Sequence, residues 1–176
     1  YGPTKLDFPR FGEDAATSFD TITLRMEAND GYAWDGAGTQ PLYARDAFGS
    51  RSHEALGQVA PHGNRVHLYI NGVYWGVYNP VERPDASFAA SYYGGDKDNW
   101  DAINDGSATD GNLDAWNEMV DLAYAAGPGN PSASARAAAY QRLQGNNPDG
   151  SDNPAYEDYL DIDNYSQRSV ISSQEG

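Results

Sequence analysis

The most regular pattern of apolar and polar positions lies between residues 66 and 78. Two runs of β-branched and aromatic residues flank Asn71-Gly72, a dipeptide that favours a two-residue turn because both residues adopt positive φ at low cost. Such a turn places His67, on the polar face, opposite Gly76. On the apolar face it predicts the cross-strand pairs Ile70–Val73, Leu68–Trp75 and Val66–Val77. The sequence therefore predicts a central antiparallel β-hairpin over residues 66–78.

The elements around this hairpin are expected to be strands and one helix before it and several helices after it. Alternating apolar and polar residues predict a half-buried strand over 19–27. Asn79-Pro80 is expected to end the second hairpin strand, because proline has no N–H for the ladder. Helices are expected from Pro41 to Leu56 and, with Asp85 and Ser132 as N-caps, over 86–93, 112–126, 132–144 and 155–165. The fold class predicted is α+β, an antiparallel sheet followed by helices.

Composition narrows the classes of function. With 176 residues the chain is long enough for one domain, and its lack of cysteine excludes disulfides and thiol chemistry. A net charge of −15 argues against nucleic acid as a partner, because phosphate contacts need clustered Lys and Arg. The sequence has no apolar run of about 18 residues, so no membrane span is expected in this segment.

Familiar sites for nucleotides and metals are absent from the sequence. It has no Gly-rich phosphate loop and no His-Arg-Asp or Asp-Phe-Gly signature. Its three histidines are too scattered for a zinc pair. Asp110, Asn112 and Asp114 have the opening spacing of a calcium loop, but Ala115 stands where that loop needs Gly and Asp121 where it needs Glu. We therefore predict no metal site and interpret this stretch as a helix N-terminus.

Several motifs resemble one family of proteins. The segment NGVYWGVYNPVERPD at 71–85 resembles the CotH family, the spore-coat-H-like atypical protein kinases. The resemblance covers most of residues 1–165 and continues, in family order, in YGPTKLDFPRF, FDTITLRMEAND, YARDAF, GNLDAWNEM and YLDIDNY. It implies a partial protein-kinase-like fold, with part of an N-lobe-like sheet and a helix in 1–83 and the start of a helical C-lobe-like region in 84–176.

The resemblance also implies candidate residues for nucleotide binding. Arg25 on the strand, with Arg45 and Asp46 on the following helix, are candidates for phosphate contact and for the strand–helix ion pair of kinases. Glu82 and Arg83 lie where kinase-like folds have the hinge that binds adenine. The alternative is that these two form a solvated ion pair or cap the next helix.

The implied activity is transfer of the γ-phosphate of ATP, with Mg²⁺ or Mn²⁺, to hydroxyls of a protein substrate such as a surface or coat protein. The location implied is extracellular, or on a bacterial cell or spore surface. The family's metal ligands and catalytic Asp follow the YLDIDNY segment, so these 176 residues are expected to be a fragment cut at both ends and inactive alone.

Two other classes of function stay open. A non-catalytic secreted or surface module would bind protein or glycan through exposed aromatic residues, namely Tyr69, Tyr74 and Tyr78 with Trp75 nearby. A calcium-dependent structural domain would use the acidic loops and would melt in a metal-dependent way.

Overall fold

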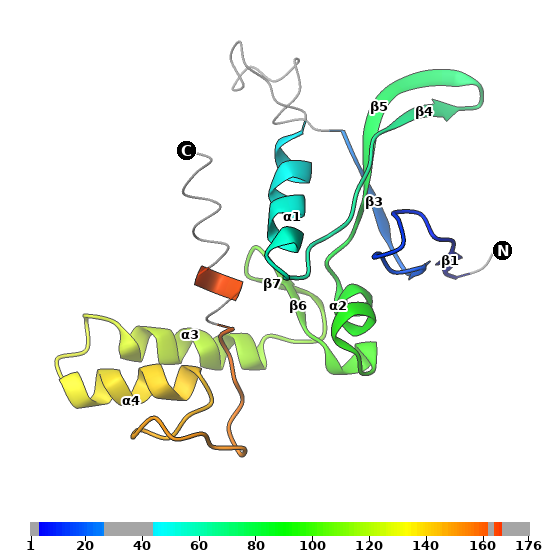
Figure 1. The fold of residues 1–176 in the computed structure, drawn as a ribbon. Helices are drawn as coiled ribbons and strands as arrows, with labels where there is room; N and C mark the ends of the chain where they lie inside the picture. The colour runs from blue at the N-terminus through cyan, green and yellow to red at the C-terminus, as the bar shows by residue number, and fades with distance from the viewer. Residues whose placement is uncertain (1–3, 27–43, 162–163, 167–176) are drawn as a thin grey trace, which may run out of the picture. The chain divides into compact units, whose positions relative to one another are not determined.

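The structure is a computed structural model that describes residues 4–26, 44–161 and 164–166 (Figure 1). It shows small antiparallel sheets together with helices, which confirms the predicted α+β class. In chain order the elements are β1 (Leu6–Asp7), β2 (Ser18–Phe19), β3 (Ile22–Arg25), α1 (Arg45–Ala55), β4 (Val66–Ile70), β5 (Val73–Glu82), α2 (Ala86–Tyr93), the 3₁₀ turn η2 (Lys97–Asn99), β6 (Ala102–Asn104), β7 (Ser107–Asp110), α3 (Asp114–Ala126) and α4 (Ala133–Leu143). No helix in the described ranges is long and apolar enough to cross a lipid bilayer.

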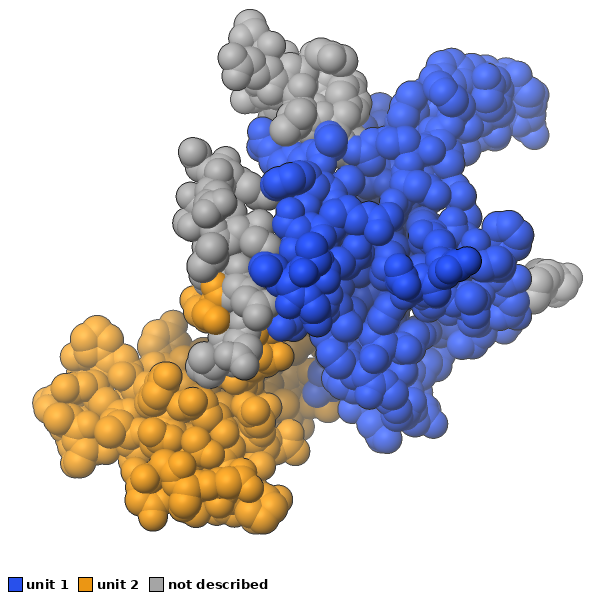
Figure 2. Space-filling model, in the orientation of Figure 1, with its two compact units in different colours: residues 1–102, 109–111 blue, residues 103–108, 112–176 orange. Residues whose placement is uncertain are grey.

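The chain divides into two compact units (Figure 2). Unit 1 comprises residues 1–102 and 109–111, and unit 2 comprises residues 103–108 and 112–176. Helix α2 thus belongs to the same unit as the sheet that precedes it. The boundary near residue 83 between lobe-like regions stays a prediction.

The principal sheet of unit 1 is organised around the long strand β5. The strand order is β3-β5-β4; β4 pairs with the first part of β5 and β3 with the second part, both antiparallel (Figure 1). The prediction that Asn79-Pro80 would end this strand was wrong, because both residues lie inside it and pair with Arg25 and Leu24. Proline removes a donor only, and the Pro80 carbonyl still accepts the Asn64 N–H at 3.2 Å.

The hairpin forms where the sequence predicts it, with a different register. Asn71 and Gly72 have φ of 51° and 80°, and Ile70 pairs with Val73 as predicted. Further from the turn the register shifts between Leu68 and Tyr69, so the predicted partners of Leu68, Val66 and His67 were wrong. The observed pairs are Leu68–Gly76, His67–Val77 and Val66–Tyr78. Trp75 is left as the extra residue of a β-bulge, which Gly76 accommodates with a φ of 123°.

The N-caps act as expected in two helices. The Asp85 carboxylate accepts the Phe88 N–H at 2.9 Å at the start of α2, and Ser132 Oγ accepts the Ala135 N–H at 3.3 Å at the start of α4. Gly94 ends α2 with a φ of 85°. Helices α2, α3 and α4 therefore agree with the sequence to within about two residues, the ordinary uncertainty of helix ends.

Two other helix predictions have different outcomes. Helix α1 ends near the predicted residue 56, while its expected start at Pro41 lies outside the described residues. The last predicted helix was wrong over 155–161, which contains no helix and includes an isolated β-bridge from Asp158 to Gln144; the described helical residues there are 164–166. Asp161 Oδ1 caps this last turn by accepting the Asn164 N–H at 2.8 Å.

Each unit has its own small core. In unit 1, Phe11, Ala15 and Phe19 are buried together, and the two phenylalanine rings meet edge to face with centroids 5.5 Å apart, a favoured geometry for aromatic pairs. In unit 2, α4 packs against α3 and buries Ala139 and Leu143.

We expect the hairpin turn to be sensitive to the loss of Gly72. The substitution Gly72→Ala places a Cβ at positive φ, which costs roughly 1–2 kcal/mol in the left-handed region, and chemical denaturation should show this loss. Gly129→Ala is the matched control, because Gly129 has neither a positive φ nor a neighbour within 4 Å of an added Cβ. Equal stability of the two variants would contradict the turn assignment.

Candidate functional site

A buried cluster of polar side chains lies at the end of β5. It comprises Glu82, the last residue of β5; Tyr92 on α2; Glu54 on α1; and His62 in the connector between α1 and β4. We refer to these four residues as the Glu82 cluster. Glu82 is 2% exposed and His62 is 7% exposed, and ionisable groups so deeply buried require partners.

Glu82 is surrounded by donors. The backbone N–H of His62 donates to Glu82 Oε2 at 2.8 Å, and His62 Nδ1 lies 2.8 Å from the same oxygen. The Tyr92 hydroxyl donates to Glu82 Oε1 at 2.8 Å. The Glu82 N–H in turn donates to the His62 carbonyl at 3.0 Å. Both carboxylate oxygens are therefore occupied by contacts from two separate segments.

His62 lies between two carboxylates. Its Nδ1 faces Glu82, and its Nε2 lies 3.3 Å from Glu54 Oε1. Carboxylates only accept hydrogen bonds, whereas a doubly protonated imidazole presents an N–H at each ring nitrogen. Each ring nitrogen of His62 therefore faces a hydrogen-bond acceptor.

Tyr92 closes the cluster from α2. Its hydroxyl accepts the Ala16 N–H at 3.0 Å, and its ring stacks on His62 with centroids 5.8 Å apart. Burial raises the pKa of Tyr92 well above its ordinary value, an effect that the Ala16 N–H opposes and the hydrogen bond to Glu82 reinforces. The hydroxyl thus stays neutral at physiological pH and acts as a donor to Glu82.

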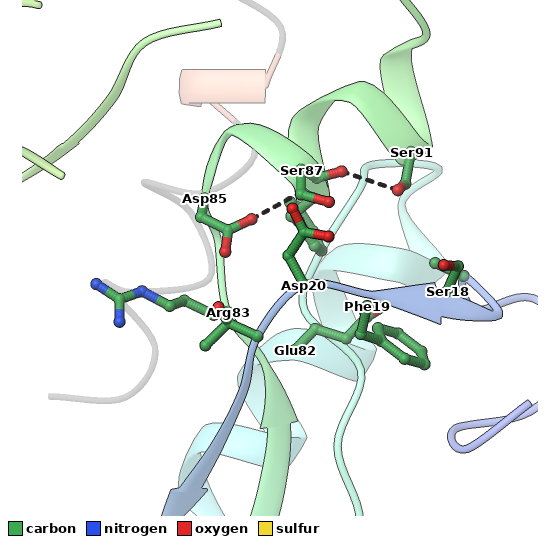
Figure 3. Close-up of a pocket in the computed structure, with 11 residues that line it drawn as sticks. Ser18, Phe19, Asp20, Glu82, Arg83, Asp85, Ser87 and Ser91 are labelled. Carbon is green, nitrogen blue, oxygen red and sulfur yellow. Dashed lines mark hydrogen bonds between the residues drawn. The ribbon is translucent and has the colours of Figure 1, made fainter. Parts of the chain in front are cut away.

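A pocket lies beside the cluster (Figure 3). It holds about 240 Å³ of empty space, including open solvent, and is lined by Ala16, Ser18, Phe19, Asp20, Thr21, Glu82, Arg83, Asp85, Ser87, Phe88 and Ser91. Ligand clefts typically measure about 300–1,000 Å³. This pocket is therefore too small by itself to enclose a nucleotide.

Two charged residues of the pocket have contrasting positions. Asp20 is paired with Lys97 at 2.7 Å and Lys5 at 3.0 Å, and the hydrogen bond from Lys97 is the main cause that lowers the pKa of Asp20. Arg83 is exposed and its guanidinium extends away from the other labelled side chains (Figure 3). The chemistry available in the pocket is thus mainly that of hydroxyls and acids.

The structure brings two of the five candidate residues together. Arg25 Nη1 on β3 contacts Asp46 Oδ2 in the first turn of α1. Arg45 is the exposed first residue of that helix. Glu82 and Arg83 lie at the exit of β5, as expected. The alternative of a solvated Glu82–Arg83 ion pair was wrong, because Glu82 is buried within its cluster.

The stretch resembling a calcium loop uses its oxygens within the protein. Asp110 Oδ2 accepts the Ala86 N–H at 3.2 Å, and Asn112 Oδ1 accepts the Asp114 N–H at 2.7 Å at the start of α3. Within residues 4–26, 44–161 and 164–166, no group of His, Asp and Glu side chains is suited to a metal ion.

Sequence reasoning identified Glu82 but missed its partners. Glu54, His62 and Tyr92 have no regular spacing, and His62 was considered only as a zinc ligand. The available signal was the polar residue at the end of an apolar strand, which needs a buried donor nearby. A buried Glu at the end of a strand predicts that hydrogen-bond donors lie nearby, but it does not identify the residues that supply them.

Comparison with known proteins gives one result. Residues 7–172 match the model of the family described as CotH kinase protein. No match was found among curated proteins or among solved structures. The family match spans both compact units and includes all four residues of the Glu82 cluster.

The neutral Tyr92 predicts a pH dependence of stability. Since the folded protein favours the protonated hydroxyl, this contribution is complete below the unfolded-state pKa of about 10 and is lost as the pH rises above it. Tyr92→Phe lacks this titration, so its melting temperature should fall less than that of the wild type between about pH 8 and pH 11. The matched control is Tyr140→Phe, which replaces a tyrosine that is half exposed. A Tyr92→Phe profile parallel to the wild type would contradict the assignment.

Proposed function

The chain belongs to the CotH kinase family, and from this premise we propose that the protein containing it transfers the γ-phosphate of ATP to hydroxyl groups of another protein. The acceptor expected from the resemblance is a surface or coat protein, at a bacterial cell surface, at a spore surface or outside the cell. The reaction needs a divalent ion, Mg²⁺ or Mn²⁺, which would neutralise charge on the transferred phosphate.

The observation that carries this proposal is the contact between Arg25 and Asp46. Kinases place a basic strand residue against the phosphates of ATP through an ion pair with the following helix. Here β3 supplies the basic residue Arg25, and α1 supplies the acidic residue Asp46. The hairpin β4–β5 follows before the chain enters α2. This order of elements supports a nucleotide-positioning role for the pair.

The exposure of this pair favours positioning over stabilisation. The Arg25 and Asp46 side chains are 50% and 36% exposed, and ion pairs this accessible contribute only about 0–1 kcal/mol to stability. We assign Arg25 and Arg45 to phosphate contact, and the backbone around Glu82 and Arg83 to contact with adenine. Asp46 orients Arg25.

The metal ligands are not assigned to the described residues. By the resemblance, those acids and the catalytic Asp follow the segment 159–165. We therefore propose that residues 1–176 supply the scaffold that faces the nucleotide and do not transfer phosphate by themselves.

A second candidate function is the binding of protein or glycan by the hairpin. Tyr69, Tyr74 and Trp75 are 61%, 50% and 57% exposed, and the two tyrosine rings lie with centroids 5.2 Å apart. Exposed aromatic surface of this kind is typical of binding sites. The substitution Trp75→Ala distinguishes this binding function from phosphoryl transfer. It should abolish the binding of protein or glycan and leave phosphoryl transfer unchanged.

We expect Arg25→Ala to lower kcat for phosphoryl transfer about 100-fold, because removing one preorganised donor to a transition-state charge has this size of effect. The assay uses the whole protein that contains this chain, with labelled ATP, Mg²⁺ or Mn²⁺ and an acceptor protein. Lys97→Ala is the matched control, since it removes a half-exposed cation from another ion pair of unit 1 and should leave kcat unchanged. Absence of both phosphoryl transfer and an ATP-induced rise in melting temperature in the whole protein would overturn the kinase proposal.

A further inference from the structure

Helix α1 has little apolar surface with which to hold its position. Of its residues, His53 is the one that is buried, and Phe48 is 64% exposed. Its sequence, RDAFGSRSHEA, contains two alanines and one phenylalanine as its apolar side chains. Because apolar burial is the usual cause of helix docking, the position of α1 depends strongly on polar contacts.

Two such contacts lie near opposite ends of α1. Asp46, in the first turn, contacts Arg25 of β3, and Glu54, in the last turn, contacts His62. These two acids are separated along the helix axis by about 12 Å at 1.5 Å per residue. A contact at each end restrains the tilt of the helix, which a single contact cannot do.

His62 is itself held firmly by β5. Glu82 accepts both its backbone N–H and its Nδ1 contact, and the Glu82 N–H donates to its carbonyl. His62 Nε2 is then the atom available to face Glu54. His62 thus forms a short bridge from the end of β5, where the adenine contact is proposed, to the end of α1.

We propose that His62 is a positioning residue that fixes the C-terminal end of α1 through Glu54 and thereby keeps Asp46 in contact with Arg25. The inference rests on the proposed function for its effect on catalysis. The bridge itself is independent of that function, so the two can be tested separately.

The substitution that tests the bridge with least disturbance is Glu54→Ala. It removes the α1 side of the bridge and leaves the contacts between His62 and Glu82 in place, and alanine favours the helix. Two matched controls are available. Arg51→Ala removes the other partner of Glu54, and Lys97→Ala breaks a different ion pair of unit 1 that involves neither α1 nor the Glu82 cluster.

The first measurement is amide hydrogen exchange on the whole protein. Glu54→Ala and His62→Gln should speed exchange across α1 about 10-fold, while the two controls leave α1 as in the wild type. Unchanged exchange in α1 of Glu54→Ala would overturn the bridge, whatever the activity.

The second measurement is kcat for phosphoryl transfer in a double-mutant cycle. Glu54→Ala and Asp46→Asn should each lower kcat about 10-fold, and the double variant should be hardly slower than either one, since both disrupt the same placement of Arg25. Additive losses, or an equal loss in Lys97→Ala, would overturn the positioning role. Faster exchange in α1 together with a wild-type protein that transfers no phosphate would sustain the bridge and reject the proposed function.

Discussion

The buried carboxylate of Glu82 is the constraint on which the arrangement of unit 1 depends. A charge at the end of β5 with 2% exposure requires donors, and the nearest segments supply them: His62 from the connector and Tyr92 from α2. Removing one partner of such a group leaves a desolvated charge, which costs several times more than an ordinary hydrogen bond contributes. The exit of β5, the connector and the end of α2 are consequently held in one geometry.

This way of holding elements differs between the two units. In unit 2, α3 and α4 pack through apolar side chains such as Leu143, and the polar contacts of Arg142 with Glu118, Tyr156 and Tyr159 lie around that contact. In unit 1, α1 has almost no apolar stripe, and its Asp46 and Glu54 side chains contact Arg25 and His62. Charge-assisted hydrogen bonds are directional, so such contacts are sensitive to the orientation of the helix as well as to its distance.

Local chemistry made much of the fold predictable. Asn71-Gly72 specified the turn, and Asp85 and Ser132 specified two helix starts, because each acts on its immediate neighbours. The register beyond the turn was not predictable, since the bulge at Trp75 depends on Gly76 adopting a φ of 123°. The passage of β5 through Pro80 also depends on non-local partners, Leu24 on one side and Asn64 on the other. The Glu82 cluster was hidden for the same reason, as its members meet only when four segments converge.

In the proposed nucleotide-positioning role, the Arg25–Asp46 pair would place a particular demand on α1. Kinases of the usual type use a Lys–Glu pair at this place. The Asp46 side chain is one methylene shorter than that of Glu, so α1 must lie closer to β3 for the contact to form. Arg25 has a planar guanidinium that stays charged and binds phosphate best in a bidentate geometry, which is sensitive to orientation as well as distance. The shorter side chain of Asp46 and the more directional binding of Arg25 would both narrow the range of α1 positions in which Arg25 can contact Asp46 and phosphate together. In the proposed role, a second anchor at the far end of α1, through the contact of Glu54 with His62, would keep the helix within this range.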